Sequence, residues 1–175
     1  MTIKIRELKQ AAKRSGSVAI AKSFNEASDK KLKTAFLCHS HLDQELAKGL
    51  QIFLKEQGLE LYIDWEDSTM PSEPNKATAD QIKNKINESD LFLFLATNNS
   101  TRSRWCPWEI GVADQLKGYE NIIIVPTMED NGSWYGNEYL QLYKRLDEGR
   151  HQLTGLDKVG VFEAGTDSGK WIKYL

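Results

Sequence analysis

Short, uninterrupted apolar runs constrain this chain more than any other feature of its sequence. Residues 91–96 are six consecutive apolar residues between polar segments, and 122–125 repeats the pattern. Strands that are buried on both faces have this composition, because helices cover each side of a parallel sheet. Stretches of helical spacing separate the runs. The alternation predicts an α/β fold with a central parallel sheet of about five strands and helices on both faces.

Short apolar runs and stretches of helical spacing also predict the remaining strands and helices. Strands are expected at 34–38, 59–63, 91–96, 122–125 and 159–162, and helices at 42–57, 78–88, 105–117 and 138–146. The first segment, 3–28, has a polar amphipathic helical pattern. We therefore expect an N-terminal helical extension over 1–31, which either packs beside the core or mediates assembly, and one domain over 32–175. Ligands of such sheets bind beyond the carboxyl ends of the strands, so a site is expected in the loops there.

Charge and cysteine content exclude several classes of function. The 175 residues carry 23 Lys and Arg against 25 Asp and Glu, so no basic field indicates a nucleic acid or a membrane surface as partner. The longest apolar run is far shorter than the ~20 residues of a membrane helix. Two cysteines without zinc-site spacing fit a reducing compartment. We expect a cytoplasmic protein without a metal site or cofactor.

The segment Ser-Arg-Trp-Cys-Pro-Trp-Glu at 103–109 is the most informative. Pro107 fits only the first turn of a helix, so this helix begins at the carboxyl edge of the sheet. Trp105 and Glu109 are four residues apart and share one helix face. An aromatic face can stack a flat cationic base, and a carboxylate can stabilise an oxocarbenium-like sugar. On the residues alone, the alternative is favoured, in which Trp105 and Trp108 are core aromatics and Glu109 is a solvated helix residue.

A second candidate is the loop that follows the strand at 59–63. Asp64 stands at the carboxyl end of that strand and would face the same edge as Glu109, although it equally suits a turn or a cap. The loop continues with an aromatic and further acidic residues over 65–76. Irregular loops of this length are usually functional or disordered.

Three motifs, in order, resemble bacterial TIR domains. Phe-Leu-Cys-His-Ser-His at 36–41 with Asp43 is similar to the first-strand box, and 62–71 is similar to the start of the BB loop. Trp-Cys-Pro-Trp-Glu at 105–109 resembles the W-x-x-x-E signature. The resemblance covers about residues 33–127. Cys38 replaces the usual serine of the box, and we expect its side chain to face the core.

The resemblance implies a flavodoxin-like fold and, as in many bacterial members, cleavage of the nicotinamide–ribose bond of NAD+. The products would be nicotinamide with ADP-ribose or a cyclic ADP-ribose, which is a signal in antiphage systems such as Thoeris. By resemblance Glu109 is the catalytic glutamate and Trp105 the aromatic that positions substrate. His39, Ser40 and Asp64 correspond to residues that contact the nucleotide.

The resemblance also implies partners. The BB loop, with Trp65, Asp67 and Met70, would complete the site of a neighbouring TIR protomer, so the chain is expected to act as a homo-oligomer. A separate effector protein would sense the nucleotide product. The alternative is a non-catalytic TIR–TIR interaction module. The pair formed by Trp105 and Glu109 favours the enzyme, because a pure adaptor has no need of it.

Overall fold

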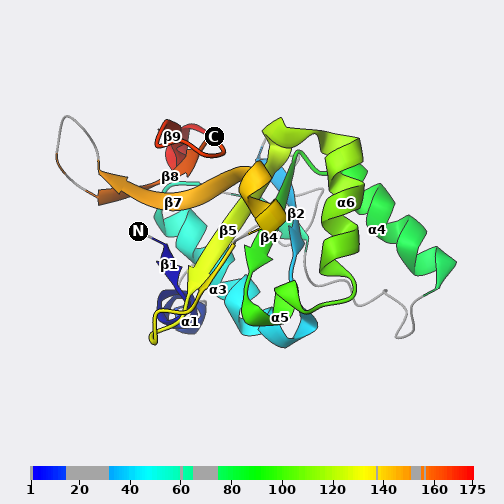
Figure 1. The fold of residues 1–175 in the computed structure, drawn as a ribbon, viewed down its shortest axis with the longest axis horizontal. Helices are drawn as coiled ribbons and strands as arrows, with labels where there is room; N and C mark the ends of the chain where they lie inside the picture. Colours follow the sequence, from blue (N-terminus) through cyan, green and yellow to red (C-terminus); the bar gives the residue numbers. More distant parts are fainter. Residues whose placement is uncertain are drawn as a thin grey trace.

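A computed structural model describes residues 2–14, 32–59, 61–64, 75–136, 138–150, 155 and 157–175. Within these residues a single sheet runs through the molecule and helices cover both of its faces (Figure 1). The expected α/β architecture is therefore confirmed. The expected boundary between an extension and a domain at residue 32 stays a prediction.

Four parallel strands form the centre of the sheet, and their order places the functional edge. These are β2 (Lys33–Cys38), β3 (Leu61–Asp64), β4 (Leu91–Ala96) and β5 (Ile122–Met128), in the spatial order β3-β2-β4-β5. The chain moves outward from β2 to β3 and then returns to the other side of β2 with β4. The order reverses between β2 and β4, which is where sheets of this type bind ligands.

Five further strands extend this centre. β7 (Lys144–Arg150) pairs parallel with β5, and β8 (Asp157–Phe162) and β9 (Gly169–Trp171) follow antiparallel. The two-residue strands β1 (Ile3–Lys4) and β6 (Trp134–Tyr135) pair with the carboxyl end of β5.

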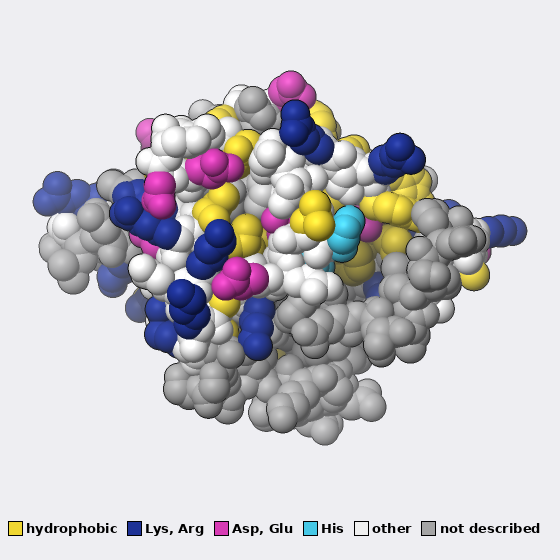
Figure 2. Space-filling view, turned by 90° about the horizontal axis from the view of Figure 1, so that it is seen from below, with side chains coloured by type: hydrophobic (Ala, Val, Ile, Leu, Met, Phe, Trp, Pro, Cys, Tyr) yellow, Lys and Arg dark blue, Asp and Glu magenta, His cyan; other side chains and the backbone are white. Residues whose placement is uncertain are grey.

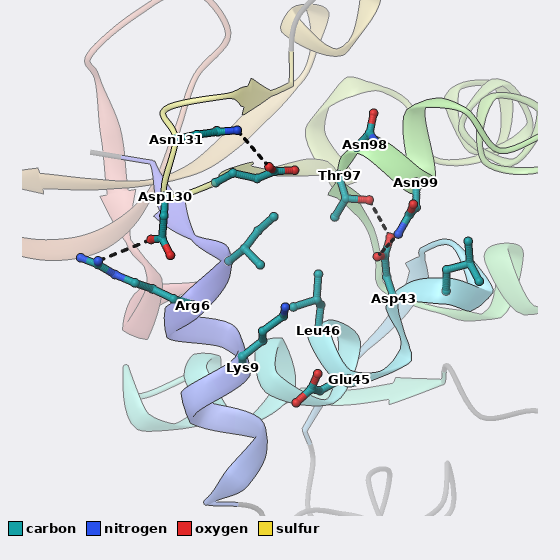
Figure 3. A pocket seen from close by; sticks show the side chains of 13 residues that line it. Arg6, Lys9, Asp43, Glu45, Leu46, Thr97, Asn98, Asn99, Asp130 and Asn131 are labelled. Carbon is teal, nitrogen blue, oxygen red and sulfur yellow. Dashed lines mark hydrogen bonds and ion pairs between the residues drawn. The ribbon is translucent and has the colours of Figure 1, made fainter.

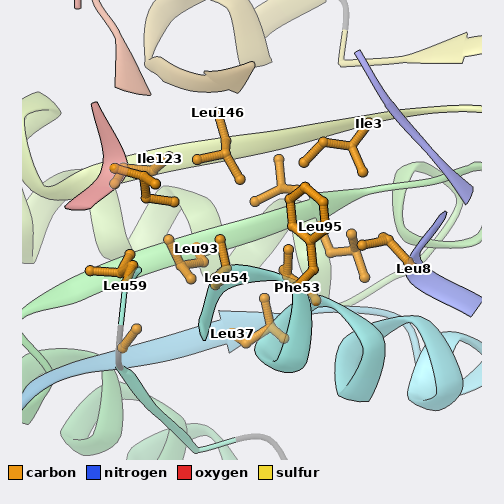
Figure 4. Close-up of a cluster of buried hydrophobic side chains, with 14 of the residues drawn as sticks. Ile3, Leu8, Leu37, Phe53, Leu54, Leu59, Leu93, Leu95, Ile123 and Leu146 are labelled. Atoms are coloured by element: carbon orange, nitrogen blue, oxygen red, sulfur yellow. The ribbon is translucent and has the colours of Figure 1, made fainter. Parts of the chain in front are cut away.

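Helices on opposite faces bury alternate residues of the strands. On one face lie α1 (Ile5–Lys13) and α3 (Gln44–Glu56), and on the other lie α4 (Lys76–Glu88) and α6 (Cys106–Lys117). Leu93 and Leu95 of β4 pack in the α1/α3 core, which Figure 4 shows. Phe92 and Phe94 pack in the α4/α6 core. A single turn, α5 (Asn98–Thr101), follows β4, and four 3-10 turns complete the elements: η2 (His41–Asp43), η3 (Tyr119–Asn121), η4 (Glu138–Leu142) and η5 (Ile172–Tyr174).

The N-terminal helix α1 packs closely against α3. Leu8 is fully buried in the core, and the backbone of α1 approaches α3 at Gly49. A Cβ atom on Gly49 would lie 2.0 Å from the carbonyl oxygen of Leu8, so only glycine fits at this crossing. Arg14 and Glu56 form an ion pair of 2.7 Å at the end of the interface. Residues 2–14 thus pack beside the core, while residues 15–31 lie outside the described residues.

Two sequence-based expectations need correction. The helix expected at 138–146 is wrong, because Glu138–Leu142 forms a 3-10 turn and the next residues enter β7. Hydrogen bonding to β5 on one side and β8 on the other makes Lys144–Arg150 a strand, although Leu146 is its only buried residue. The strand expected at 122–125 continues to Met128. Pro126 occupies the last pair with β4, a position at which a strand tolerates a residue without an N–H.

Candidate active site

The carboxyl ends of β2, β4 and β5 open onto one face of the molecule, which Figure 2 views directly. Charged side chains of both signs are interspersed there, and a histidine lies near the middle of the face. This mixture agrees with the net charge of −2. The described residues of this face therefore offer individual polar groups to a ligand and form no broad field of one sign.

Glu109 is positioned by the first turn of α6. The hydroxyl of Ser103 accepts hydrogen bonds from the backbone N–H groups of Trp105 (3.1 Å) and Cys106 (3.3 Å), which fixes where the helix begins. Pro107 stands in the first turn, as the sequence predicts. The N–H of Glu109 then donates to the carbonyl of Trp105 at 2.8 Å.

The Glu109 carboxyl is nearly enclosed, with only 9% of the residue exposed. Burial raises its pKa above the usual value, and hydrogen bonding by the Cys38 thiol partly opposes this effect. The interpretation of Glu109 as a solvated helix residue is therefore wrong. Cys38 faces the core, as expected, and its pKa is raised well above that of an ordinary thiol, chiefly by burial.

The two tryptophans that precede Glu109, Trp105 and Trp108, are both half-buried. Their rings meet edge to face, with centroids 5.3 Å apart, and both pack against the α4/α6 core. The ammonium of Lys83 lies 6.0 Å from the centroid of the Trp108 ring. Each indole thus packs against the core and stays partly exposed, so the role of Trp105 toward a substrate stays a prediction.

His39 and Ser40 follow β2 at the same edge. His39 is half-buried, with Nδ1 3.0 Å from the carbonyl oxygen of Leu37. Burial lowers its pKa, which favours the neutral imidazole. The Ser40 hydroxyl is buried and accepts a hydrogen bond from the N–H of Leu42, which caps the turn η2. Ser40 therefore shapes the loop after β2, whatever it contacts in a complex.

Asp43, which is not among the predicted site residues, holds two loops of this edge together. Its buried carboxylate accepts hydrogen bonds from the Thr97 hydroxyl at 2.6 Å and the Asn99 amide at 2.7 Å (Figure 3). These bonds tie the loop after β2 to the loop after β4. The position of Asp43 in the first-strand box was the available signal, but its partners come from another strand.

A cavity of about 660 Å³ adjoins this network, between α1, the start of α3 and the loops after β4 and β5. Figure 3 shows Lys9 and Glu45 at its border, with Arg6 paired to Asp130 at 3.4 Å. Of the predicted site residues that the structure describes, none lines this cavity. The cavity and the Glu109 neighbourhood are thus separate features of the same edge.

Most of the second predicted loop, after β3, lies outside the described residues. Asp64 is the last residue of β3, beside Phe36 of β2, and its side chain is outside the described part. Trp65, Asp67 and Met70 lie outside the described residues. Their expected roles stay predictions. Among the described helices, none combines the length and the apolar character needed to cross a membrane.

The fold and the residues at its carboxyl edge define a TIR domain. The TIR domain family model matches residues 35–156, so the chain belongs to this family. The β2 box, the β4 edge and the Trp105–Glu109 segment all lie inside the matched region.

Two curated relatives add detail. The chain is 32% identical over 123 residues to the "Probable 3' cyclic ADP-D-ribose synthase ThsB'" of Bacillus cereus (strain MSX-D12). It is 23% identical over 129 residues to the "Putative cyclic ADP-D-ribose synthase TIR2" of Cytobacillus dafuensis. The alignments cover 68% and 63% of this chain, but 63% and 33% of the two relatives. The chain therefore matches less than two thirds of either relative.

Proposed function

We propose that this chain cleaves the nicotinamide–ribose bond of NAD+, with Glu109 as the catalytic carboxylate. The products would be nicotinamide and either ADP-ribose or a cyclic ADP-ribose that serves as a signal in bacterial antiphage defence. One observation carries the proposal: Glu109 is buried in the first turn of α6, at the sheet edge where this fold binds ligands. The names of the two relatives support the same chemistry.

The environment of Glu109 suits this reaction. Departure of nicotinamide leaves positive charge on the ribose, and a nearby carboxylate stabilises that charge. The interaction is stronger in a poorly solvated site than in water. Burial also raises the pKa of Glu109, because it disfavours the charged carboxylate. A cationic sugar beside the carboxylate would offset this cost and stabilise the charged form.

The other site residues take supporting roles in this proposal. Trp105 stacks on the base and holds the reactants close together, and His39, Ser40 and Asp64 contact the nucleotide. A second TIR protomer completes the site with its BB loop, so activity requires assembly. A separate effector protein then detects the product.

Product identity tests the proposal. The protein is incubated with NAD+ over a range of protein concentrations, and the nucleotides are separated by chromatography with mass detection. We expect nicotinamide together with ADP-ribose or an isomer of cyclic ADP-ribose. Intact NAD+ at every concentration, with protein self-association still measurable, would instead identify a TIR–TIR interaction module.

A further inference from the structure

Two thiols and the Glu109 carboxylate converge beneath the sheet edge. One ligand atom from each of Cys38, Cys106 and Glu109 lies within 4.8 Å of the other two. Cys38 is the last residue of β2, and Cys106 and Glu109 are three apart on α6, which places them on one face of the helix. The packing of α6 against the end of β2 therefore creates a three-residue cluster.

The chemistry of the cluster is selective among cations. Thiolates favour borderline-soft ions such as Zn2+, while Mg2+ and Ca2+ require oxygen ligands. With Zn–S near ~2.3 Å and Zn–O near ~2.0–2.2 Å, the ligand atoms of a tetrahedral site are separated by roughly 3.4–3.8 Å. The ligand atoms lie within 4.8 Å of one another, so side-chain rotations that move each atom by about 1 Å would bring them to tetrahedral distances. Three protein ligands leave one position open for water.

The polar interactions of these three groups are weak thiol contacts, among them the hydrogen bond of the Cys38 thiol to the Glu109 carboxylate. Both cysteines are only 1% exposed, and their neighbours in the α4/α6 core are apolar. The Cys38 sulfur lies 3.9 Å from the carbonyl oxygen of Cys106, and a thiol is a weak hydrogen-bond donor. A metal ion would thus replace weak interactions by coordinate bonds.

We propose that Cys38, Cys106 and Glu109 form a binding site for Zn2+ or a similar borderline-soft cation, and that its occupation inhibits the enzyme. Each thiol releases its proton to solvent as it becomes a thiolate ligand, and the Glu109 carboxylate binds through one oxygen. The carboxylate is then no longer available to the ribose of NAD+. The inhibitory part rests on the proposed function, whereas metal binding does not.

Cobalt is the spectroscopic probe for binding. Metal-free protein, kept reduced with a phosphine, is titrated with Co2+, and thiolate-to-cobalt absorption is recorded before displacement by Zn2+. We expect one ion per chain with two sulfur ligands. Since Cys38 and Cys106 are the only cysteines in the sequence, the parent spectrum assigns the sulfur ligands even if a cysteine variant fails to fold. A parent protein without this absorption overturns the proposal.

Variants define the ligands. Partners that merely orient metal ligands are worth 10–100-fold in affinity, so Cys38→Ser or Cys106→Ser should weaken Zn2+ binding by at least about 100-fold. Glu109→Gln should keep the sulfur absorption and weaken binding. His41→Ala is the matched control, because His41 is exposed in the loop after β2 and is not part of the cluster. Loss of the spectrum in His41→Ala would contradict the assignment.

An assay of nicotinamide release distinguishes metal binding from the inhibition that it is proposed to cause. Zn2+ should suppress nicotinamide release over the concentration range in which it displaces Co2+, and a chelator should restore it. Binding without inhibition overturns the inhibitory role. Metal-free protein that binds Co2+ but never cleaves NAD+ overturns the proposed function and leaves the metal site standing.

Discussion

Replacement of Gly49 by alanine tests how firmly α1 is docked on α3. The added methyl group would lie 2.0 Å from the carbonyl oxygen of Leu8 and 2.7 Å from its carbonyl carbon. Both are backbone atoms, so no side-chain rotation relieves the overlap, and the two helices must move apart by about 1 Å or more to regain normal contact. Gly111→Ala is a matched control, because it lies in α6 with nothing within 4 Å of the new Cβ.

The expected loss of stability combines three contributions. Alanine improves helix propensity by about 1 kcal/mol at either position. At Gly49, overpacking costs about 1–3 kcal/mol. Displacement of α1 also exposes part of Ile3 and Leu8, each worth about 1.5–3 kcal/mol when fully buried. The net loss for Gly49→Ala is about 2–4 kcal/mol, whereas Gly111→Ala gains up to about 1 kcal/mol.

Thermal unfolding followed by circular dichroism measures both changes. At roughly 2–4 °C per kcal/mol for a chain of this size, Gly49→Ala should lower Tm by about 4–16 °C and Gly111→Ala should raise it by about 2–4 °C. Hydrogen exchange should report faster exchange across Ile5–Lys13 in Gly49→Ala alone. If Gly49→Ala raises Tm as the control does, the packing of α1 on α3 described above is wrong.

Three further predictions concern the site. Trp105→Ala should lower the proportion of cyclic product more than total NAD+ consumption, because cyclisation depends on close positioning; chromatography of the products measures this. With a chelator present, kcat/KM should fall with acid at a midpoint above 4.5, the ordinary glutamate value, because burial raises the pKa of Glu109 and the charged form is required. The folded chain therefore keeps the Glu109 proton to a higher pH than the unfolded chain does. Its free energy of unfolding falls as the pH rises from the unfolded pKa through the folded pKa. Glu109→Gln, which carries no charge, should thus be at least as stable as the parent at pH 7. Specific activity should rise with protein concentration, and Trp65→Ala with Met70→Ala should flatten that rise.

Each of these has a clear contrary result. An unchanged product ratio in Trp105→Ala would assign that side chain to the core. An acid midpoint at or below the ordinary glutamate value, or a Glu109→Gln variant less stable than the parent at pH 7, would contradict the effect of burial. Specific activity that stays constant over a hundredfold dilution would show that each monomer carries a complete site.

The central sheet was predictable because its strands carry their own signal. The apolar run at 91–96 coincides with β4, and the helices after β2 and β4 follow from 3.6-residue spacing and from Pro107. β7 was not predictable, since its sequence is largely charged and Leu146 alone is buried. That segment becomes a strand because β5 and β8 supply hydrogen bonds on both sides.

In the candidate site, too, some features are predictable from the local sequence and others depend on tertiary packing. The position of Glu109 in the first turn of a helix follows from the local sequence. Its contact with Cys38 does not, because it depends on how α6 packs against the end of β2. The bonds from Thr97 and Asn99 to Asp43 likewise join residues more than fifty positions apart.

Nicotinamide release in the parent and in Glu109→Gln tests the central claim most directly. The substitution preserves shape and removes charge, and Glu88→Gln, at an exposed end of α4, is the matched control. All three proteins are incubated with NAD+ at equal, high concentration with a crowding agent and a chelator. We predict nicotinamide in step with NAD+ loss for the parent and Glu88→Gln, and none above background for folded Glu109→Gln. Equal release by Glu109→Gln, or none from the parent, would contradict the claim that Glu109 makes this TIR domain an NAD+-cleaving enzyme.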